Sequence, residues 1–126
     1  MENTLVIIKP DGVERYIIGK LIGRFESEQL KIINMRMLTM SREIAEAHYA
    51  EHRGKHFYGE LIEYIISGPS VALILEGENA ISHVRTLNEA LREEYRVDAT
   101  KNTVHGSDSK ESAAREIKLF FGSSSV

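Results

Sequence analysis

The sequence predicts an α+β protein with a ferredoxin-like fold, in which a four-stranded antiparallel sheet carries its flanking helices on one face. Short apolar segments typical of strands alternate with segments of helical periodicity. Their order is β-α-β-αα-β-α-β-α, which fits the split β-α-β arrangement. The 126 residues suffice for one hydrophobic core, so we expect a single domain over residues 1–126.

Four segments have strand-like patterns. The first and third are continuous aliphatic runs, typical of buried strands. Pro10 and the Asp11-Gly12 pair favour a turn directly after the first run. The second segment alternates, with Ile33, Met35 and Met37 set against Asn34 and Arg36. The predicted strands span residues 4–8, 31–39, 71–75 and 99–104.

Helical periodicity and capping residues define the segments between the strands. Ser41 and Asn79 are predicted N-caps, and Asp108 with Glu111 forms a capping-box pattern. No Gly or Pro interrupts residues 80–95, which favours one continuous helix, although a tight turn at Asn88-Glu89 is the alternative. The predicted helices span residues 18–29, 42–51, 57–66, 80–95 and 108–121.

The overall composition excludes several classes of protein. The net charge is −3 with scattered basic residues, which argues against a surface devoted to nucleic acid. There is no cysteine, hence no disulfide framework. The longest apolar run, residues 5–8, is too short to span a membrane, and no signal peptide is evident. We therefore expect a cytoplasmic protein with a frayed tail at residues 122–126.

His105 is the first candidate for chemistry. It precedes Gly106 at a predicted strand-to-helix corner, beside a helix N-terminus that favours negative charge. A neutral imidazole there could attack a phosphate. From spacing alone, a structural role for a single histidine is the simpler interpretation.

The residues around His105 change this interpretation. The segment Asn-x-x-His-Gly-Ser-Asp-Ser at residues 102–109 closely resembles the active-site signature of nucleoside diphosphate kinases. The resemblance covers nearly the whole chain and implies the ferredoxin-like fold. The other matching positions are residues 4–13, His48-Tyr49, Phe57, residues 67–69, Glu76-Gly77, Arg85, Ser112-Ala113 and Phe121.

The resemblance implies a catalytic role for five residues. His105 would take the γ-phosphoryl group from a nucleoside triphosphate and pass it to a diphosphate in a ping-pong cycle. Glu116 would orient the imidazole, and Ser107 would place a hydroxyl near the same ring. Tyr49 would pack near His105 and the phosphates, and Lys9 would neutralise phosphate oxygens.

The resemblance also implies a nucleotide site. Arg85 and Arg92 would join Lys9 on the phosphates, and Asn102 would bind the sugar 3′-hydroxyl together with Lys9. Phe57 would stack on the base, which every base permits. Mg²⁺ would bridge phosphate oxygens and arrive with the nucleotide, because no carboxylate cage for a metal is visible.

Without the resemblance, simpler roles would be favoured. Lys9 would be an exposed lysine at a strand end, and Tyr49 and Phe57 would be core residues. Glu116 would be a solvated carboxylate on a helix, and Asn102 would make a local turn bond.

Three other histidines recur every four residues, at His48, His52 and His56. On one helix they would share a face, as zinc-binding pairs do. No Glu completes a His-Glu-x-x-His pattern, and Gly54 is expected to end the helix before His56. We therefore predict no physiological metal site here.

One segment departs from the family. Only residues 86–91 separate Arg85 from Arg92, about ten residues fewer than the family pattern. The family's phosphate-binding threonine of this loop has no clear match, so Thr86 is given no role. In the family the loop caps the cleft and contributes to contacts between dimers. We expect a homo-oligomer built from dimers through the sheet or a flanking helix, with higher assembly weakened.

Three functions remain to be separated. The set of matched residues favours an active kinase acting on nucleoside tri- and diphosphates. The shortened segment leaves open a nucleotide-binding or assembly module with weakened turnover. A ferredoxin-like nucleic-acid binder would need exposed aromatics on the sheet and excess positive charge, and the sequence has neither.

Overall fold

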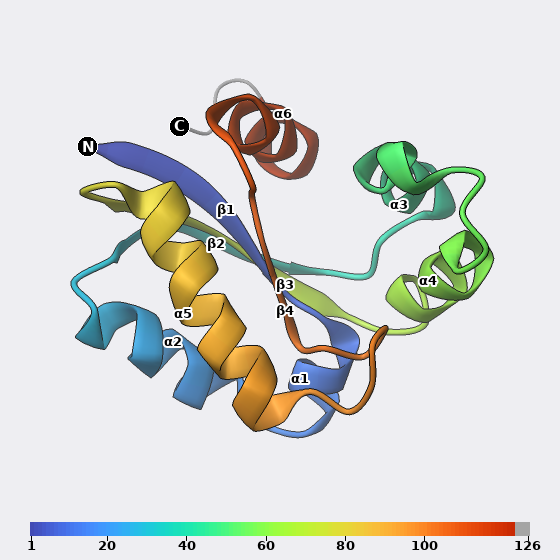
Figure 1. The fold of residues 1–126 in the computed structure, drawn as a ribbon, viewed down its shortest axis with the longest axis horizontal. Coiled ribbons are helices and arrows are strands. Elements are labelled where there is room, and N and C mark those ends of the chain that lie inside the picture. Colours follow the sequence, from blue (N-terminus) through green and yellow to red (C-terminus); the bar gives the residue numbers. More distant parts are fainter. Residues whose placement is uncertain (123–126) are drawn as a thin grey trace.

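An antiparallel sheet organises the computed structural model, which describes residues 1–122 (Figure 1). The strand order is β2-β3-β1-β4, and all three pairings are antiparallel. This confirms the predicted ferredoxin-like fold. The strands are β1 (Glu2–Ile8), β2 (Lys31–Leu38), β3 (Ser70–Gly77) and β4 (Val104–Gly106).

The helices lie between the strands in the predicted order. The predicted turn after β1 is the short helix α1, with Pro10 at its first position. The helix capped by Ser41 ends at His48, and a 3₁₀ turn, η1, follows it. The helical elements are α1 (Pro10–Glu14), α2 (Ile18–Ser27), α3 (Arg42–His48), η1 (Ala50–His52), α4 (Tyr58–Ile65), α5 (Ala80–Tyr95) and α6 (Lys110–Phe121).

Helices cover both faces of the sheet, and the prediction of a single covered face is wrong. Val6 and Ile8 of β1 pack in one core with α2 and α5. Leu5 and Ile7 pack on the opposite face with α3, α4 and α6. Figure 1 shows the two groups of helices on either side of the strands. The continuous apolar run of β1 follows from this burial on both faces.

The last strand is shorter than predicted, and His105 lies within it, opposite Ile7 of β1. Thr103 has a φ of 77°, a left-handed conformation that interrupts the extended run before Val104. Upstream, the Asp98 carboxylate accepts hydrogen bonds from the backbone of residues 100 and 101 and forms a turn. Residues 99–103 are therefore an irregular loop.

The cap of the last helix differs from the prediction by one residue. Ser109 is the N-cap, and it exchanges hydrogen bonds with Ser112 in a capping box. Asp108 instead accepts the Ser112 hydroxyl at 2.8 Å. Residues 123–126 of the tail, expected to be frayed, lie outside the described residues.

Helix α5 is continuous from Ala80 to Tyr95, as predicted. Asn79 is its N-cap by position, but its φ is 49° and its side chain accepts no cap bond. The carboxylate of Glu2 accepts the Ile81 N–H instead. At β4, a Cβ on Gly106 would lie 2.7 Å from Nδ2 of the buried Asn88, so a larger residue there would have to displace this side chain of α5.

Strand β2 forms an edge of the sheet and leaves apolar side chains exposed. The strand is confirmed, with an irregularity between Ile32 and Asn34. Ile33, Met35 and Met37 are 36%, 51% and 56% exposed.

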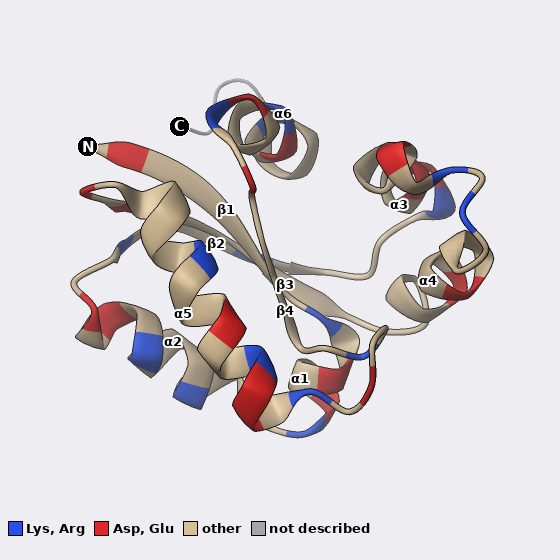
Figure 2. Cartoon of the chain, viewed as in Figure 1, with Lys and Arg blue, Asp and Glu red and all other residues tan. Residues whose placement is uncertain are grey.

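Acidic and basic residues are interspersed along the chain. Helices α2 and α5 carry both acidic and basic residues (Figure 2). Within the part of the chain that the structure describes, no helix combines the length and apolarity needed to cross a membrane.

Candidate active site

A cavity of about 440 Å³ brings together five of the predicted site residues from distant parts of the chain. It lies among the end of β1, the α3–α4 region, the irregular loop and β4. A second cavity, about 520 Å³, lies between the start of β1 and α6 and is lined by none of them. The predicted residues lining the first cavity are Lys9, Tyr49, Phe57, Asn102 and His105.

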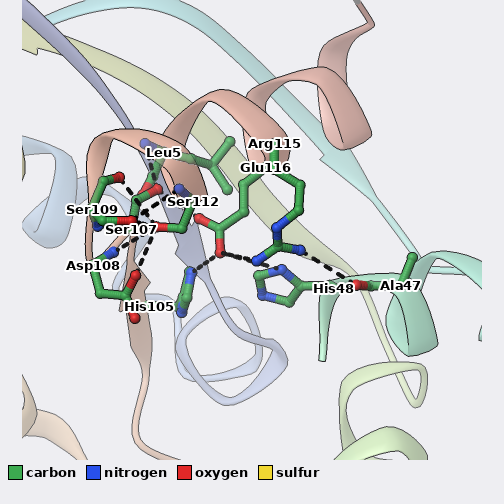
Figure 3. Close-up of polar contacts among 10 residues, drawn as sticks. All are labelled: Leu5, Ala47, His48, His105, Ser107, Asp108, Ser109, Ser112, Arg115 and Glu116. Carbon is green, nitrogen blue, oxygen red and sulfur yellow. Dashed lines mark hydrogen bonds and ion pairs between the residues drawn. The ribbon is translucent and has the colours of Figure 1, made fainter. Parts of the chain in front are cut away.

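His105 presents a defined side of its ring to the protein. Its Nε2 lies 3.2 Å from Oε2 of Glu116, and its side chain is 22% exposed (Figure 3). A carboxylate only accepts hydrogen bonds, so Nε2 is the donor in this contact and carries the proton whenever the ring is neutral. The lone pair then lies on Nδ1, which has no hydrogen-bond partner among residues 1–122.

Glu116 is buried, and its second carboxylate oxygen is also hydrogen-bonded. Its residue is 3% exposed, and Oε1 accepts the Ser107 hydroxyl at 2.6 Å. Ser107 is itself fully buried, and its oxygen accepts the backbone N–H of Leu5 at 3.3 Å. One carboxylate oxygen is thus fixed by Ser107, while the other faces the His105 imidazole.

His48 is a neighbour of this pair to which sequence reasoning gave no role. Its ring packs edge-on against His105, with centroids 4.7 Å apart, and its Nδ1 lies 3.8 Å from Oε2 of Glu116. Both ring nitrogens are buried without a hydrogen bond. Burial holds the pKa of His48 well below its usual value, so the ring is neutral. The only sequence signal was the matched His48-Tyr49 pair.

Lys9 is a buried cation rather than an exposed lysine. It is 6% exposed, and its Nζ donates to Oδ1 of Asn102 at 2.9 Å. Burial, with a smaller effect of Arg92, lowers the Lys9 pKa to about 8, while Asp11 opposes the shift. Lys9 and Asn102 therefore form one polar unit at the cavity.

A buried network that the sequence analysis missed fixes this unit. Asp11 is 4% exposed and accepts the Thr103 hydroxyl at 2.8 Å and the Tyr64 hydroxyl. The Thr103 carbonyl in turn accepts the Lys9 N–H at 2.8 Å. Its one sequence signal is the Asp of the Lys-Pro-Asp-Gly segment.

The two arginines of α5 differ in position. Arg92 is half-buried, and its Nε donates to the Val104 carbonyl at 3.0 Å, one residue before His105. Burial, followed by the charge of Arg85, lowers the Arg92 pKa. Arg85 is exposed, and neither arginine lines the cavity. Arg15 donates to the Tyr95 carbonyl at the end of α5.

The two aromatic candidates form one wall of the cavity. Tyr49 is 6% exposed and packs against His48 with ring centroids 4.5 Å apart. Burial raises the pKa of its hydroxyl, which has no hydrogen-bond partner in the described chain. Phe57 is half-buried, with the rings of His52 and His56 each 5.5 Å away.

The three evenly spaced histidines do not converge. His48 is buried beside Glu116, His52 contacts Lys55, and His56 is exposed. Within residues 1–122, one cluster of at least three metal-ligand side chains occurs, formed by His48, His105 and Glu116. Two imidazoles and one carboxylate do not suit Mg²⁺, which prefers oxygen ligands.

Comparisons with known proteins agree on one family. The sequence model described as nucleoside diphosphate kinase matches residues 2–126. A nucleoside diphosphate kinase of Archaeoglobus fulgidus is 49% identical over all of this chain and 90% of its own length. One from Rubrobacter xylanophilus is 51% identical, covering 97% of this chain and 99% of its own.

A solved structure extends the agreement to three dimensions. The Aquifex aeolicus nucleoside diphosphate kinase superposes with a TM-score of 0.91 at 38% identity, covering 99% of this chain and 98% of that one. The match to the Archaeoglobus enzyme extends over 136 residues, ten more than the 126 of this chain. The difference agrees in size with the shortening expected from the sequence.

Proposed function

The chain belongs to the nucleoside diphosphate kinase family of phosphotransferases, and we propose that His105 carries the transferred phosphoryl group in a ping-pong cycle. One observation supports this most directly. Glu116 occupies Nε2 of His105, which leaves the Nδ1 lone pair free on a partly exposed ring that lines the cavity.

In the first half of the cycle, Nδ1 attacks the γ-phosphorus of a nucleoside triphosphate. The bond from phosphorus to the bridging oxygen breaks, and the diphosphate leaves with that electron pair. The ring gains positive charge as the P–N bond forms, and Glu116 stabilises it through Nε2–H. In the second half, a terminal oxygen of another diphosphate attacks the phosphorus, and the P–N electron pair returns to Nδ1.

The cations and polar groups in and near the cavity suit the nucleotide. Lys9 and Arg92 would neutralise phosphate oxygens, with Arg85 reaching from about two turns earlier on α5. The Lys9–Asn102 unit would bind the sugar hydroxyl. Phe57 offers an aromatic face without a base-specific hydrogen bond, which fits broad use of bases.

Mg²⁺ would reach the site on the nucleotide phosphates, where it neutralises charge as the phosphoryl group moves. No residue of the described cavity is proposed as its ligand. Phosphate oxygens and water would complete its shell.

We also propose a homo-oligomer built from dimers through β2. Ile33, Met35 and Met37 leave an apolar stripe on an edge strand, a surface typical of a partner contact. Light scattering should show a dimer, or a larger assembly of dimers that dissociates on dilution. A robust hexamer would contradict weakened higher assembly.

A cytoplasmic location remains a prediction, to be checked by cell fractionation.

Labelling with γ-³²P ATP tests the mechanism. The wild-type protein should form an acid-labile, base-stable phosphoprotein, and added diphosphate should remove the label. His105→Ala should abolish labelling, while His83→Gln, at a partly exposed position on α5 beside Glu28, should leave it intact. Labelling of His105→Ala at the wild-type level would refute the proposed nucleophile.

The same experiment separates the kinase from a module with weakened turnover. Rapid labelling with rapid discharge indicates an active kinase. Rapid nucleotide binding with labelling over hours would instead support the weakened module. Circular dichroism of His105→Ala should match the wild-type spectrum, which makes its loss of labelling interpretable.

A further inference from the structure

Three ligand atoms converge beneath the cavity from three different elements. Nε2 of His105 on β4 and Nδ1 of His48 at the end of α3 lie 3.2 and 3.8 Å from the same Oε2 of Glu116 on α6. All the candidate ligand atoms of the cluster lie within 4.8 Å of one another. Figure 3 shows both imidazoles turned toward the Glu116 carboxylate.

These separations fit a tetrahedral metal site. Zn²⁺ binds imidazole nitrogen and carboxylate oxygen at about 2.0–2.2 Å, which places neighbouring ligands about 3.3 Å apart. Two of the three separations are within about half an ångström of that value. Two imidazoles and one carboxylate are also the three-ligand set of many zinc sites that keep a fourth position open.

The burial of these side chains is typical of metal ligands and not of solvated surface groups. His48 and Glu116 are each 3% exposed, and both nitrogens of His48 lack a hydrogen bond. Ser107 holds Oε1 of Glu116 at 2.6 Å, which orients Oε2 as an outer-shell partner does in metal sites. His105 lines the cavity, so an ion can enter there and take water as its fourth ligand.

We propose that His48, His105 and Glu116 bind a borderline divalent transition metal ion, Zn²⁺ or a close chemical relative, and that this ion inhibits the enzyme. The metal takes the Nε2 lone pair of His105. The proton of the neutral ring then sits on Nδ1, so the ring keeps its proton count but loses its free lone pair. An imidazole in that state cannot attack phosphorus. The inhibition rests on the proposed role of His105, whereas metal binding does not.

The positive charge of Arg115 should weaken binding of the metal ion. Its NH2 lies 3.9 Å from Oε2 of Glu116, which places a positive charge beside the oxygen that the ion would use. The Arg115 side chain is 47% exposed, and its other terminal nitrogen donates to the Ala47 carbonyl at 3.5 Å. A variant that removes this guanidinium should therefore bind the ion more tightly.

Titration of the nucleotide-free protein with Co²⁺ tests the site. One equivalent should produce the intense visible absorption of tetrahedral Co²⁺, and Zn²⁺ should displace it while Mg²⁺ should not. His48→Gln and Glu116→Gln should abolish the band. Ser107→Ala should weaken binding about 10- to 100-fold, and Arg115→Gln should strengthen it.

His56→Gln and His83→Gln are the matched controls, because both remove an exposed or partly exposed histidine outside the cluster and should leave the band unchanged. Absence of the band in the wild type, or its persistence in His48→Gln, would overturn the proposal. If His48→Gln fails to fold, loss of the band in Arg115→Gln would overturn it equally.

Inhibition is measured separately. With excess Mg²⁺, Zn²⁺ in slight excess over enzyme should lower ³²P labelling of wild type at least tenfold, and EDTA should restore it. His48→Gln, if it labels, should resist Zn²⁺. Binding of Co²⁺ without loss of labelling would refute the inhibition, while failure of all labelling without metal would refute the nucleophile instead.

Discussion

Replacing Lys9 with methionine should stabilise the protein at neutral pH while removing a cation from the proposed nucleotide site. The pKa of Lys9 falls from 10.5 to about 8, mainly because the ammonium is buried. At 1.36 kcal/mol per pKa unit, keeping this lysine protonated costs the folded state about 3 kcal/mol. The lost bond from Nζ to Asn102 offsets about 1 kcal/mol of the gain.

The sign of the pH dependence follows from proton binding. Between about pH 8 and 10.5 the unfolded chain keeps the Lys9 proton and the folded chain has released it, so wild-type stability rises with pH. Below pH 8 both states are protonated and the full cost is present. The advantage of Lys9→Met over wild type should therefore be largest at pH 7 and shrink by about 3 kcal/mol by pH 10.5.

Urea denaturation at pH 7, 9 and 10.5 measures this difference. With a slope of about 2 kcal/mol per molar urea, the Lys9→Met midpoint should exceed the wild-type midpoint by about 1 M at pH 7. Protein concentration must be equal throughout, because assembly contributes to stability. Lys20→Met, at an exposed position on α2, is the control. An advantage that stays constant or grows with pH would refute the reasoning.

Three further predictions concern the site. For wild type, kcat/KM should fall as pH rises through about 8, since Lys9 must be protonated to bind phosphate in its proposed role, and a pH–rate profile with the Lys9→Arg variant checks this. Ser107→Ala removes a 2.6 Å bond to the buried Glu116 carboxylate and should cost about 2 kcal/mol, or a melting temperature about 10 °C lower by calorimetry. Phe57→Ala should raise KM about tenfold for purine and pyrimidine nucleotides alike with little change in kcat, as steady-state kinetics would show.

Each of these has a result that would count against it. A profile of Lys9→Arg that still falls near pH 8 would assign the titration to another group. Ser27→Ala, which removes an exposed hydroxyl on α2, should change the melting temperature little, and an equal loss there would deny a special role to Ser107. An effect of Phe57→Ala on one base class alone would indicate a specific contact rather than stacking.

Local patterns were sufficient to predict most of the fold. The aliphatic runs in β1 and β3 and the unbroken periodicity of α5 each reflect contacts of one element with the core. The prediction was wrong where contacts with residues distant in sequence determine the local backbone conformation. Thr103 adopts a positive φ where its carbonyl binds the Lys9 N–H, 94 residues earlier in the chain, and no pattern within residues 99–104 reports that bond.

The candidate site was predictable only through the resemblance. Spacing alone does not distinguish His105 from a histidine with a structural role. From sequence alone Glu116 resembles an ordinary solvated carboxylate on a helix, whereas the structure buries it. Lys9 is buried although lysines at strand ends are usually exposed. His48 was not predicted as a site residue, because its place in the site comes from its contacts with His105 and Glu116 and not from its neighbours in sequence.

The contact of α5 with Gly106 has a consequence for how this enzyme can vary. Asn88 and Val84 would meet any Cβ at position 106 at 2.7 and 3.2 Å, so a larger residue would act as a wedge between helix and strand. That wedge would shift Arg92 and His105 together, since the Arg92 guanidinium is anchored to the carbonyl preceding His105. The cation and the proposed nucleophile are thus coupled through the backbone, so a substitution at position 106 should displace both together rather than either one alone.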